Sequence, residues 1–514
     1  MFELVDRPAL GELTDAALID AVEHRTRAEA VEAAGRLAAI AEIVARHCDD
    51  EDDTSAYRAI DGWETATAAV SAACNLSRGA ASAQMRIAQA LRERLPKVAA
   101  VFARGDISAK VVSTITWRTQ LVTDDDALAL IDTALAGAAT TYGALTATKT
   151  EHAIDVWVEK FDPAAVRKTR TAARERDIHF GDPDDPNGTV SIWGRLLATD
   201  AALIKNLLTT MTRGVCDNDP RTIGQRRSDA LGALGAGADH LTCQCGNPGC
   251  EATGIDPRSR AVVIHLLAEI LPQPATSAHS DDEAETPTAD PAEPPRDPRI
   301  HGKPDPSDYP ADRTPAVSGS PAVILGGGVV PAPLLAELIA TGATVKHVTR
   351  PDDLTAQPHY RPSSKLAAFV QMRDLVCMFP GCGVAAHNCD LDHTTPWPVG
   401  ATHPGNLGPK CRTHHLLKTF EIGDNGWTDV QHPDGSHTWT APTGHTYRTT
   451  PFSQILFPDW AIHTPAPSAK SAPMATIDRH TKMPVRQRTR QQSRTQRINT
   501  ERRLNTELDK PPPY

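Results

Sequence analysis

Two pairs of metal-competent residues near the C-terminal end most constrain what this chain can fold into. Cys377 and Cys382 form a C-x4-C pair, and Cys411 and His414 form a C-x2-H pair. Thiolate and imidazole groups in two such pairs are the donors of a closed structural zinc site. A segment with little apolar core of its own draws much of its folding energy from such a metal. We therefore expect a small domain pinned by Zn²⁺.

A second polar set is interleaved with the first and consists of Asp392 with His393, then Asn406, then His415. Carboxylate and imidazole groups suit a harder divalent cation and a proton-accepting base, which together assist the attack of water on a phosphodiester. On a helix beginning near Cys411, His414 shares the face of Cys411, whereas His415 is rotated by about 100° from His414. One short helix can therefore serve zinc on one side and chemistry on the other.

The order of these residues, in PGC, LDH, NLGPKC and HH-x2-K, resembles the HNH endonuclease motif. In that motif a His ends the first strand of a β-hairpin, an Asn lies in the loop, and a second His lies on the following helix. The resemblance implies that His393 is the general base and that Asn406 orients His393 or the loop. It implies that Asp392 and His415 hold one catalytic cation, Mg²⁺ or another divalent ion. Lys418, one turn beyond His415, would contact phosphate as a point charge.

A simpler interpretation is a zinc knuckle that only binds nucleic acid or protein, with His393 and His415 as ordinary polar residues. The Asp-His pair, the Asn and the second His all stand in register, which disfavours that interpretation. Cys389 is a spare thiol on the same predicted strand as Asp392. We expect Cys389 to be packed rather than bound to zinc.

A second cysteine cluster, HLTCQCGNPGC, contains Cys243, Cys245 and Cys250. Three thiols separated by Gly and Pro turns can ligate a metal, and His240 is the nearest candidate for a fourth ligand. The C-x-C spacing is tight for tetrahedral zinc. A possible second metal site and a turn containing reduced thiols therefore both remain open.

The length of 514 residues predicts two or three domains. The formal net charge of −11 is unevenly distributed. Residues 272–321 are acidic and Pro-rich and predict a disordered linker, whereas residues 459–514 predict a disordered basic tail. That tail resembles a flexible arm for phosphate backbones, with a solubilising tail as the alternative. Its basic residues are Arg479, Lys482, Arg486, Arg488, Arg490, Arg494, Arg497, Arg502 and Arg503.

The remaining patterns predict an α+β fold that is mainly α. Residues 14–271 read as one mainly helical domain, with an amphipathic stripe at Leu37, Ile40 and Val44. Ser77 is predicted to cap a helix that ends near Pro96, and Asp106 or Ser108 to cap the next one. Further helices are expected over residues 125–135 and 145–161.

The later part of this half predicts a small hairpin over residues 178–180 and 189–197, with Asn187-Gly188 as its turn. Thr199 or Asp200 is predicted to cap a helix running to Met211. A strand-helix segment over residues 322–360 would complete the first domain, and residues 361–458 would form the nuclease domain with following β-hairpins. Arg167, Arg170 and Arg174 form a basic ridge that is either phosphate-binding or simply a solvated helix face.

The N-terminal residues lack the apolar core of a signal peptide, and no run is long enough to cross a bilayer. The clustering of most cysteines favours metal binding over disulfides. We therefore expect a cytoplasmic protein without a membrane partner.

Taken whole, the chain resembles the mycobacterial thirteen-E-twelve repeat family, in which a helical domain of unknown function precedes an HNH domain. The tracts LRERLPKVAAVFARGDIS, CQCGNPGC and VILGGGVVPAPLLAELIATGA, with the Arg373-Asp374 pair and the DNGWTDVQHPDGSHTW tract, support that resemblance. It implies a metal-dependent DNA endonuclease acting on duplex or single-stranded DNA. The alternative is a catalytically silent nucleic-acid-binding or mobile-element scaffold. Homo-oligomerisation is compatible with either hypothesis.

Overall fold

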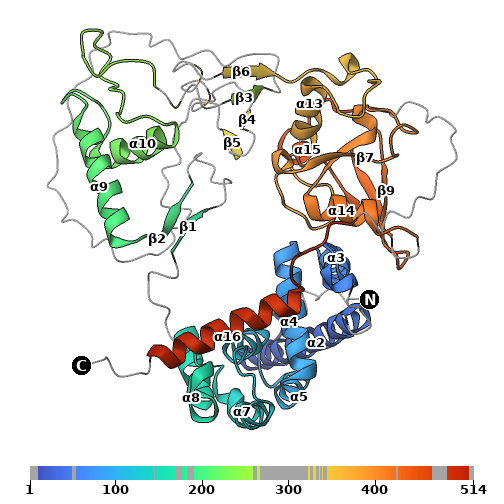
Figure 1. Ribbon diagram of the computed structural model, residues 1–514. Helices are drawn as coiled ribbons and strands as arrows, with labels where there is room; N and C mark the ends of the chain where they lie inside the picture. The colour runs from blue at the N-terminus through green and yellow to red at the C-terminus, as the bar shows by residue number, and fades with distance from the viewer. Residues whose placement is uncertain are drawn as a thin grey trace. The chain divides into compact units, whose positions relative to one another are not determined.

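Two compact units make up the computed structural model, one formed by Met1–Glu175 with Thr349–Tyr514 and the other by Arg176–Val348 (Figure 1). The predicted mainly helical domain over residues 14–271 is divided between these two units, because the chain passes from the first to the second after Glu175. The structure describes residues 10–48, 54–143, 145–167, 176–181, 190–256, 344–423, 426–465 and 483–508, the short strands 263–266, 322–324 and 328–330, and the single positions 258, 335 and 339. The predicted linker over residues 272–321 and the Asn187-Gly188 turn lie outside these ranges.

The first unit begins with a helical bundle whose elements follow the predicted apolar pattern. Its stripe of Leu37, Ile40 and Val44 is buried, as expected. The hydroxyl groups of Ser77 and Ser108 accept hydrogen bonds from backbone N–H groups in the first turns of the helices that follow, which confirms both caps. The helices are α2 (Asp15–Cys48), α3 (Gly62–Cys74), α4 (Arg78–Glu93), α5 (Pro96–Ala103), α6 (Ala109–Arg118), α7 (Asp125–Ala138) and α8 (Ala147–Phe161).

The predicted disordered tail is wrong for residues 490–508, which form helix α16 (Arg490–Leu508) running beside α4 (Figure 1). This helix has no apolar stripe, so polar contacts hold it on the bundle. Arg502 binds the Asp162 carboxylate at 2.6 Å, and the Asn505 amide donates to the carbonyls of Ala164 and Val166 at 2.9 and 2.8 Å. Acceptors distant in sequence therefore order a segment that looks disordered by composition.

The acidic partners of the tail lie at the start of α3. Arg490 binds Asp61 at 2.9 Å and Glu64 at 2.6 Å, and Arg486 binds Asp61 as well. Both carboxylates are buried, so these pairs are better shielded from solvent than surface ion pairs. Of the predicted basic ridge, Arg167 packs over the Trp117 ring and binds Glu501, while Arg170 and Arg174 lie outside the described residues.

The second unit contains helices and two small sheets. Strands β1 (Asp177–Phe180) and β2 (Ile192–Arg195) form the predicted antiparallel hairpin. Helix α9 (Ala198–Arg213) begins after Leu197 without a side-chain cap, so the predicted caps at Thr199 or Asp200 are wrong. Helix α10 (Ile223–Gly235) starts with a capping box between Thr222 and Gln225.

Segment 322–347 joins this second unit through a four-stranded sheet ordered β5-β4-β3-β6. Strand β3 (Val263–Leu266) pairs antiparallel with β4 (Ala322–Ile324) and parallel with β6 (Thr344–His347), and β5 (Gly328–Val330) pairs with β4. The segment thus completes the sheet begun by β3, but residues from Thr349 onward belong to the first unit, which corrects the predicted boundary at residue 360.

The C-terminal part of the first unit surrounds an aromatic core. Phe379 packs edge-on against Trp427 and Trp439, and the Trp439 indole donates to the Met378 carbonyl at 2.6 Å. This core joins the predicted zinc-binding segment to the following three-stranded sheet. Its elements are α13 (Ser364–Asp374), β7 (Asp390–His393), β8 (Leu407–Lys410), α14 (Arg412–Phe420), β9 (Thr428–Gln431), β10 (His437–Thr440), β11 (Thr446–Thr449) and α15 (Phe452–Leu456).

Within the described part of the chain, no helix combines the length and apolar character needed to cross a membrane.

Candidate metal and catalytic site

A β-hairpin followed by a helix carries the predicted functional residues. Strands β7 and β8 pair antiparallel with Asp392 opposite Gly408 and His393 opposite Leu407. Cys411 follows β8 directly and is the N-cap residue of α14. The local strand-loop-strand-helix order is therefore the one expected from the spacing of the polar residues.

The predicted zinc ligands come together in one group. The ligand atoms of Cys377, Cys382, Cys411 and His414 all lie within 4.8 Å of one another, and three of the four residues are buried. The His414 ring stacks on Phe379 at 3.9 Å, which fixes the ring with its Nδ1 atom 3.2 Å from Cys411 Sγ. Such a group of thiols and imidazole can hold a metal such as zinc.

The thiols of this group share protons with one another. The Cys382 thiol hydrogen-bonds to Cys377, so the pKa of Cys377 lies well below its ordinary value while that of Cys382 is raised. A bound cation would stabilise thiolate at both positions and remove this competition. Cys389 is outside the group, and its thiol approaches the Ala385 carbonyl at 3.4 Å, as expected for a packed thiol.

The second imidazole of the helix, His415, faces the hairpin. Its Nδ1 atom lies 2.7 Å from Asp390 Oδ2, and its Nε2 atom lies 3.5 Å from Asp392 Oδ1. A carboxylate on Nδ1 fixes the tautomer that leaves the Nε2 lone pair available, an arrangement found behind metal-binding histidines. Asp392 and His415 are therefore the two residues that would hold a divalent cation at this hairpin.

Asp390 was not predicted as a site residue. Asp390 and Asp392 are two residues apart on β7, so both carboxylates leave the strand on the same face. That alternation is the signal that could have identified Asp390 as the group holding His415.

The predicted general base, His393, is buried, with the residue 4% exposed. Its Nε2 atom lies 2.9 Å from Thr402 Oγ1, and the same hydroxyl is 2.6 Å from the His359 carbonyl. Because the carbonyl can only accept, the hydroxyl hydrogen goes there and Nε2 must donate to Oγ1. The neutral His393 ring therefore carries its lone pair on Nδ1, which has no hydrogen-bond partner among the residues the structure describes.

Burial lowers the pKa of His393 from its ordinary value of 6.5, against the opposing effect of the Asp392 carboxylate. The neighbouring lysines, Lys418 and Lys410, lower it further. The imidazole is consequently neutral at neutral pH, which is the state a general base requires.

Asn406 holds the loop between the two strands rather than facing an open site. Its amide donates to the carbonyls of Thr395 and Ala401 at 3.0 and 2.9 Å, and its Oδ1 atom accepts from the Thr395 N–H at 2.7 Å. Arg373, paired with the Asp374 carboxylate, anchors the other end of this loop through the carbonyls of Pro404 and Leu407. The expected loop-orienting role of Asn406 fits these contacts.

The predicted phosphate contact of Lys418 needs correction. Its ammonium group lies 2.9 Å from Asp392 Oδ2, 2.8 Å from Asp429 Oδ1 and 2.8 Å from the His393 carbonyl. The side chain is only 11% exposed, so its charge is already neutralised inside the protein. Lys418 is ion-paired with both Asp392 and Asp429. Its structural role is therefore to position Asp392, and its ammonium group is not available for phosphate.

Asp429, on β9, was also missed by the sequence reasoning. It binds the fully buried Lys410 at 3.1 Å and the His437 ring at 3.0 Å. Burial raises the pKa of Asp429, but Lys410, His437 and Lys418 outweigh that effect and hold it well below the ordinary value. Nothing local in the sequence pairs a residue of β9 with one of α14, so only the fold could reveal this contact.

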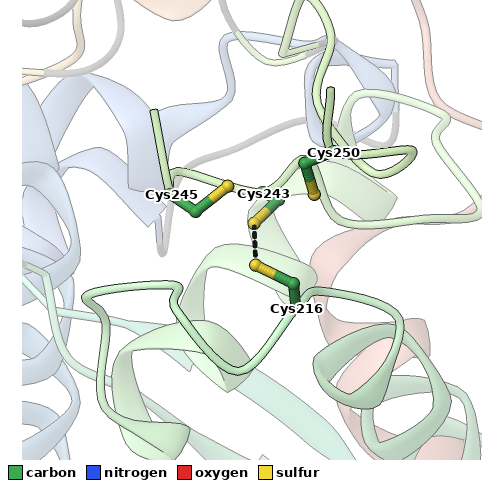
Figure 2. A group of neighbouring side chains, drawn as sticks. All are labelled: Cys216, Cys243, Cys245 and Cys250. Carbon is green, nitrogen blue, oxygen red and sulfur yellow. Dashed lines mark hydrogen bonds between the residues drawn. The ribbon is translucent and has the colours of Figure 1, made fainter. Parts of the chain in front are cut away.

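The second cysteine cluster gains its fourth ligand from a distant turn. Cys216, just after α9, brings its Sγ atom to 3.5 Å from Cys243 Sγ (Figure 2). The sulfur atoms of Cys216, Cys243, Cys245 and Cys250 all lie within 4.8 Å of one another. His240, the predicted fourth ligand, is exposed and turns toward Asp239 instead. The structure therefore groups the three predicted thiols, but the fourth member is Cys216 from another segment and not His240.

A buried ion pair holds the two segments of this cluster together. Asp219 accepts from the Gln244 N–H at 3.0 Å, and Arg221 bridges Asp219 and the Thr242 carbonyl, each at 2.7 Å. The hydrogen bonds from Arg221, helped by that N–H group, lower the pKa of Asp219 although burial opposes the shift. Four thiols fixed in this way can hold a metal such as zinc.

We expect Cys216→Ser to reduce the zinc content of the purified chain from about two equivalents to about one, because a hydroxyl group is a poor replacement for thiolate. Metal analysis of protein desalted without chelator measures this directly. Cys74→Ser, which removes a thiol packed against the helical core, is the matched control. Two equivalents retained by Cys216→Ser would show that the cluster is not a four-thiolate site.

Comparisons of the sequence with known proteins found a matching family model and similar proteins. A family model described as a domain of unknown function (DUF222) matches residues 24–289. The uncharacterized protein Rv3776 of Mycobacterium tuberculosis is 50% identical over 518 residues, covering 100% of this chain and 95% of the relative. The uncharacterized protein Rv2100 of the same species is 50% identical over 526 residues, covering 100% and 93%. No solved structure matches the chain.

Proposed function

The chain belongs to the family described as a domain of unknown function (DUF222), and we propose that this member is a metal-dependent DNA endonuclease of the HNH type. The observation that carries the proposal is that the two carboxylate oxygens of Asp392 have different partners. Its Oδ2 atom receives Lys418 and Lys410, whereas its Oδ1 atom faces His415 Nε2. The two lysines therefore orient the carboxylate and leave one oxygen directed toward a cation site.

The tracts quoted above also assign the protein, by resemblance, to the thirteen-E-twelve repeat group. Cys377, Cys382, Cys411 and His414 would hold a structural Zn²⁺, and the four-cysteine cluster would hold a second one. Asp392 and His415 would hold a catalytic Mg²⁺ or another divalent ion. That ion would supply Lewis acidity and stabilise negative charge on the leaving oxygen.

In the proposed reaction, His393 Nδ1 takes a proton from a water molecule that attacks phosphorus. A new P–O bond forms as the proton moves to the ring, and the bond to the ester oxygen breaks. The Nε2–H group keeps its hydrogen bond to Thr402, so the ring does not need to turn during proton transfer. Asn406 keeps the loop that carries Thr402 in place through its contacts to Thr395 and Ala401.

A catalytically silent nucleic-acid-binding scaffold is the second candidate. The specific observation in its favour is that Lys418 and Lys410 already neutralise part of the Asp392 charge, which weakens attraction for a dication. A supercoiled-plasmid assay with the full-length, zinc-loaded chain separates the candidates. We expect nicking with added Mg²⁺ or Mn²⁺ and none with EDTA. Absence of cleavage with either metal on duplex plasmid and single-stranded DNA would leave the scaffold hypothesis.

The pH dependence of nicking follows from His393. Burial places its pKa below 6.5, so the neutral, proton-accepting ring predominates at neutral pH and is lost as the pH falls through the lowered pKa. We expect an initial rate that is flat near neutrality and that falls by half only below about pH 6.5. Asp392 does not contribute in this range, because Lys410 and Lys418 keep its pKa low despite burial.

Initial nicking rates measured at constant free Mg²⁺ and ionic strength test this expectation. Circular dichroism over the same range controls for unfolding. A midpoint above the ordinary histidine value would contradict His393 as the base, because the buried imidazole has a lowered pKa.

A further inference from the structure

A cavity of about 360 Å³ lies between α4, α6 and α16 in the helical part of the first unit. Its wall carries an unusual concentration of cationic side chains, with one carboxylate, Glu501, among the lining residues. The volume lies within the range of small-ligand sites. The arginines around it are Arg86, Arg94, Arg167, Arg494 and Arg497.

Two of these arginines already have hydrogen-bond or ion-pair partners within the protein. Arg94 donates to the carbonyls of Thr119 and Val122, at 3.0 and 2.9 Å. Because these acceptors are neutral, they do not offset the positive charge of Arg94. Arg167 binds Glu501 at 3.5 Å and packs over the Trp117 ring at 3.6 Å. Glu501 is thus already engaged by one of the five cations.

The other three arginines have no carboxylate partner. Within the described ranges, Arg86, Arg494 and Arg497 have no carboxylate within ion-pair distance. By contrast, Arg490 of helix α16 binds two carboxylates and Arg502 binds one. Glu93 and Asp125 act on the cluster electrostatically from nearby, but neither lines the cavity. The cavity wall therefore has an excess of positive charge.

Arg86 and Arg497 are exposed and Arg494 is half-buried, so solvent screens only part of the repulsion among these cations. Burial and then repulsion from Arg497 and Arg494 lower the pKa of Arg86, and burial with Arg497 does the same for Arg494. Guanidinium groups nevertheless stay protonated at neutral pH, so the repulsion persists. Cations that line one cavity without acidic partners are typical of an anion-binding site.

We infer that this cavity binds a ligand carrying at least two phosphoryl groups. Planar guanidinium forks match phosphate oxygens and form charge-assisted, often bidentate hydrogen bonds. Ile87, Ile498 and Trp117 line the same cavity and provide apolar surface for the rest of such a ligand. The phosphates have two sources, a free nucleoside polyphosphate or the backbone of a nucleic-acid strand. This site goes beyond the proposed nuclease, because it uses none of the hairpin residues.

Isothermal titration calorimetry with the full-length, zinc-loaded chain tests the inference in Mg²⁺-free buffer. Inorganic tripolyphosphate, ATP and a short single-stranded oligodeoxynucleotide are the three probes. We expect the double substitution Arg494→Gln with Arg497→Gln to weaken tripolyphosphate binding at least about tenfold. The control Arg488→Gln, whose guanidinium reaches only Gln496 among the described contacts, should bind like the parent.

Thermal unfolding gives a second readout. Because removing two repelling cations relieves repulsion, the double variant should have a Tm equal to or above that of the parent without ligand, and tripolyphosphate should no longer raise it. Weaker binding together with a lower ligand-free Tm would attribute the loss to damaged packing and overturn the inference.

The probes also separate the sources of phosphate. Binding of tripolyphosphate and ATP that depends on Arg494 and Arg497 supports a small-molecule site, and dependence seen only with the oligonucleotide supports a backbone site. Binding that is absent for all probes, or equal in parent and double variant, overturns the inference. His393→Ala should bind tripolyphosphate like the parent, so failure of the nuclease proposal would leave this titration unchanged.

Discussion

Replacing His393 with alanine is expected to lower the rate of plasmid nicking by about 10²–10⁴-fold, the contribution typical of a general base. The expectation rests on the Thr402 hydroxyl, which gives its hydrogen to the His359 carbonyl and so directs the Nε2–H of His393 away from the reaction. Only Nδ1 is left to accept a proton. Alanine removes that lone pair but leaves Asp392 and His415, the proposed cation ligands, in place.

The matched control is His387→Ala, which removes an exposed imidazole from the same C-terminal part of the chain. It should nick at the parental rate. Both variants need equal zinc content and superimposable far-ultraviolet circular dichroism, so that a loss of rate is not a loss of fold. Nicking by His393→Ala at the parental rate would reject the proposed mechanism and point to another nuclease in the preparation.

The largest expected effect on stability comes from Cys411→Ser. Cys411 supplies one thiolate of the four-residue group and is also the residue from which α14 begins. Structural zinc contributes on the order of 10 kcal/mol to the folding of small domains. We therefore expect loss of one zinc equivalent and unfolding around Trp427 and Trp439, which pack on the same core.

The helical bundle should remain folded in this variant, because its own core of buried Ala, Leu, Ile and Val residues is large. Near-ultraviolet circular dichroism reports on the tryptophan core and far-ultraviolet on the helices. Cys389→Ser is the control, since its thiol lies outside the ligand group. If Cys389→Ser loses as much zinc as Cys411→Ser, the ligand assignment is wrong.

The corrections to the site share one physical origin. Lys418 was expected to meet phosphate because it follows His415 by one helical turn, and that local geometry is right. Its actual partner, Asp429, comes from a strand of a different sheet. Spacing predicts which face of an element a residue occupies, but it does not predict what the rest of the fold brings to that face.

The tail shows the same limit at the level of whole elements. Helix α16 has a composition typical of a disordered, solvated segment, and it is ordered by carboxylates and carbonyls far away in sequence, among them Asp162 and Ala164. Composition gives the residues that a segment contains, but it does not show which hydrogen-bond acceptors the rest of the fold brings to that segment. Of the arginines assigned to a flexible arm, Arg490 and Arg502 hold the helix on the bundle, whereas Arg494 and Arg497 line a cavity.

The sequence alone was enough to predict the zinc-type quartet, the β7–β8 hairpin, the separation of His414 from His415, and the helix caps at Ser77 and Ser108. Each depends on residues close in sequence, whose relative directions follow from helical and strand periodicity. The tertiary structure alone decided Cys216 as the fourth thiol, Asp429 as the partner of both lysines, and Arg494 and Arg497 beside Arg86. These contacts join distant segments, and their formation depends on the packing of the whole chain, which no local period encodes.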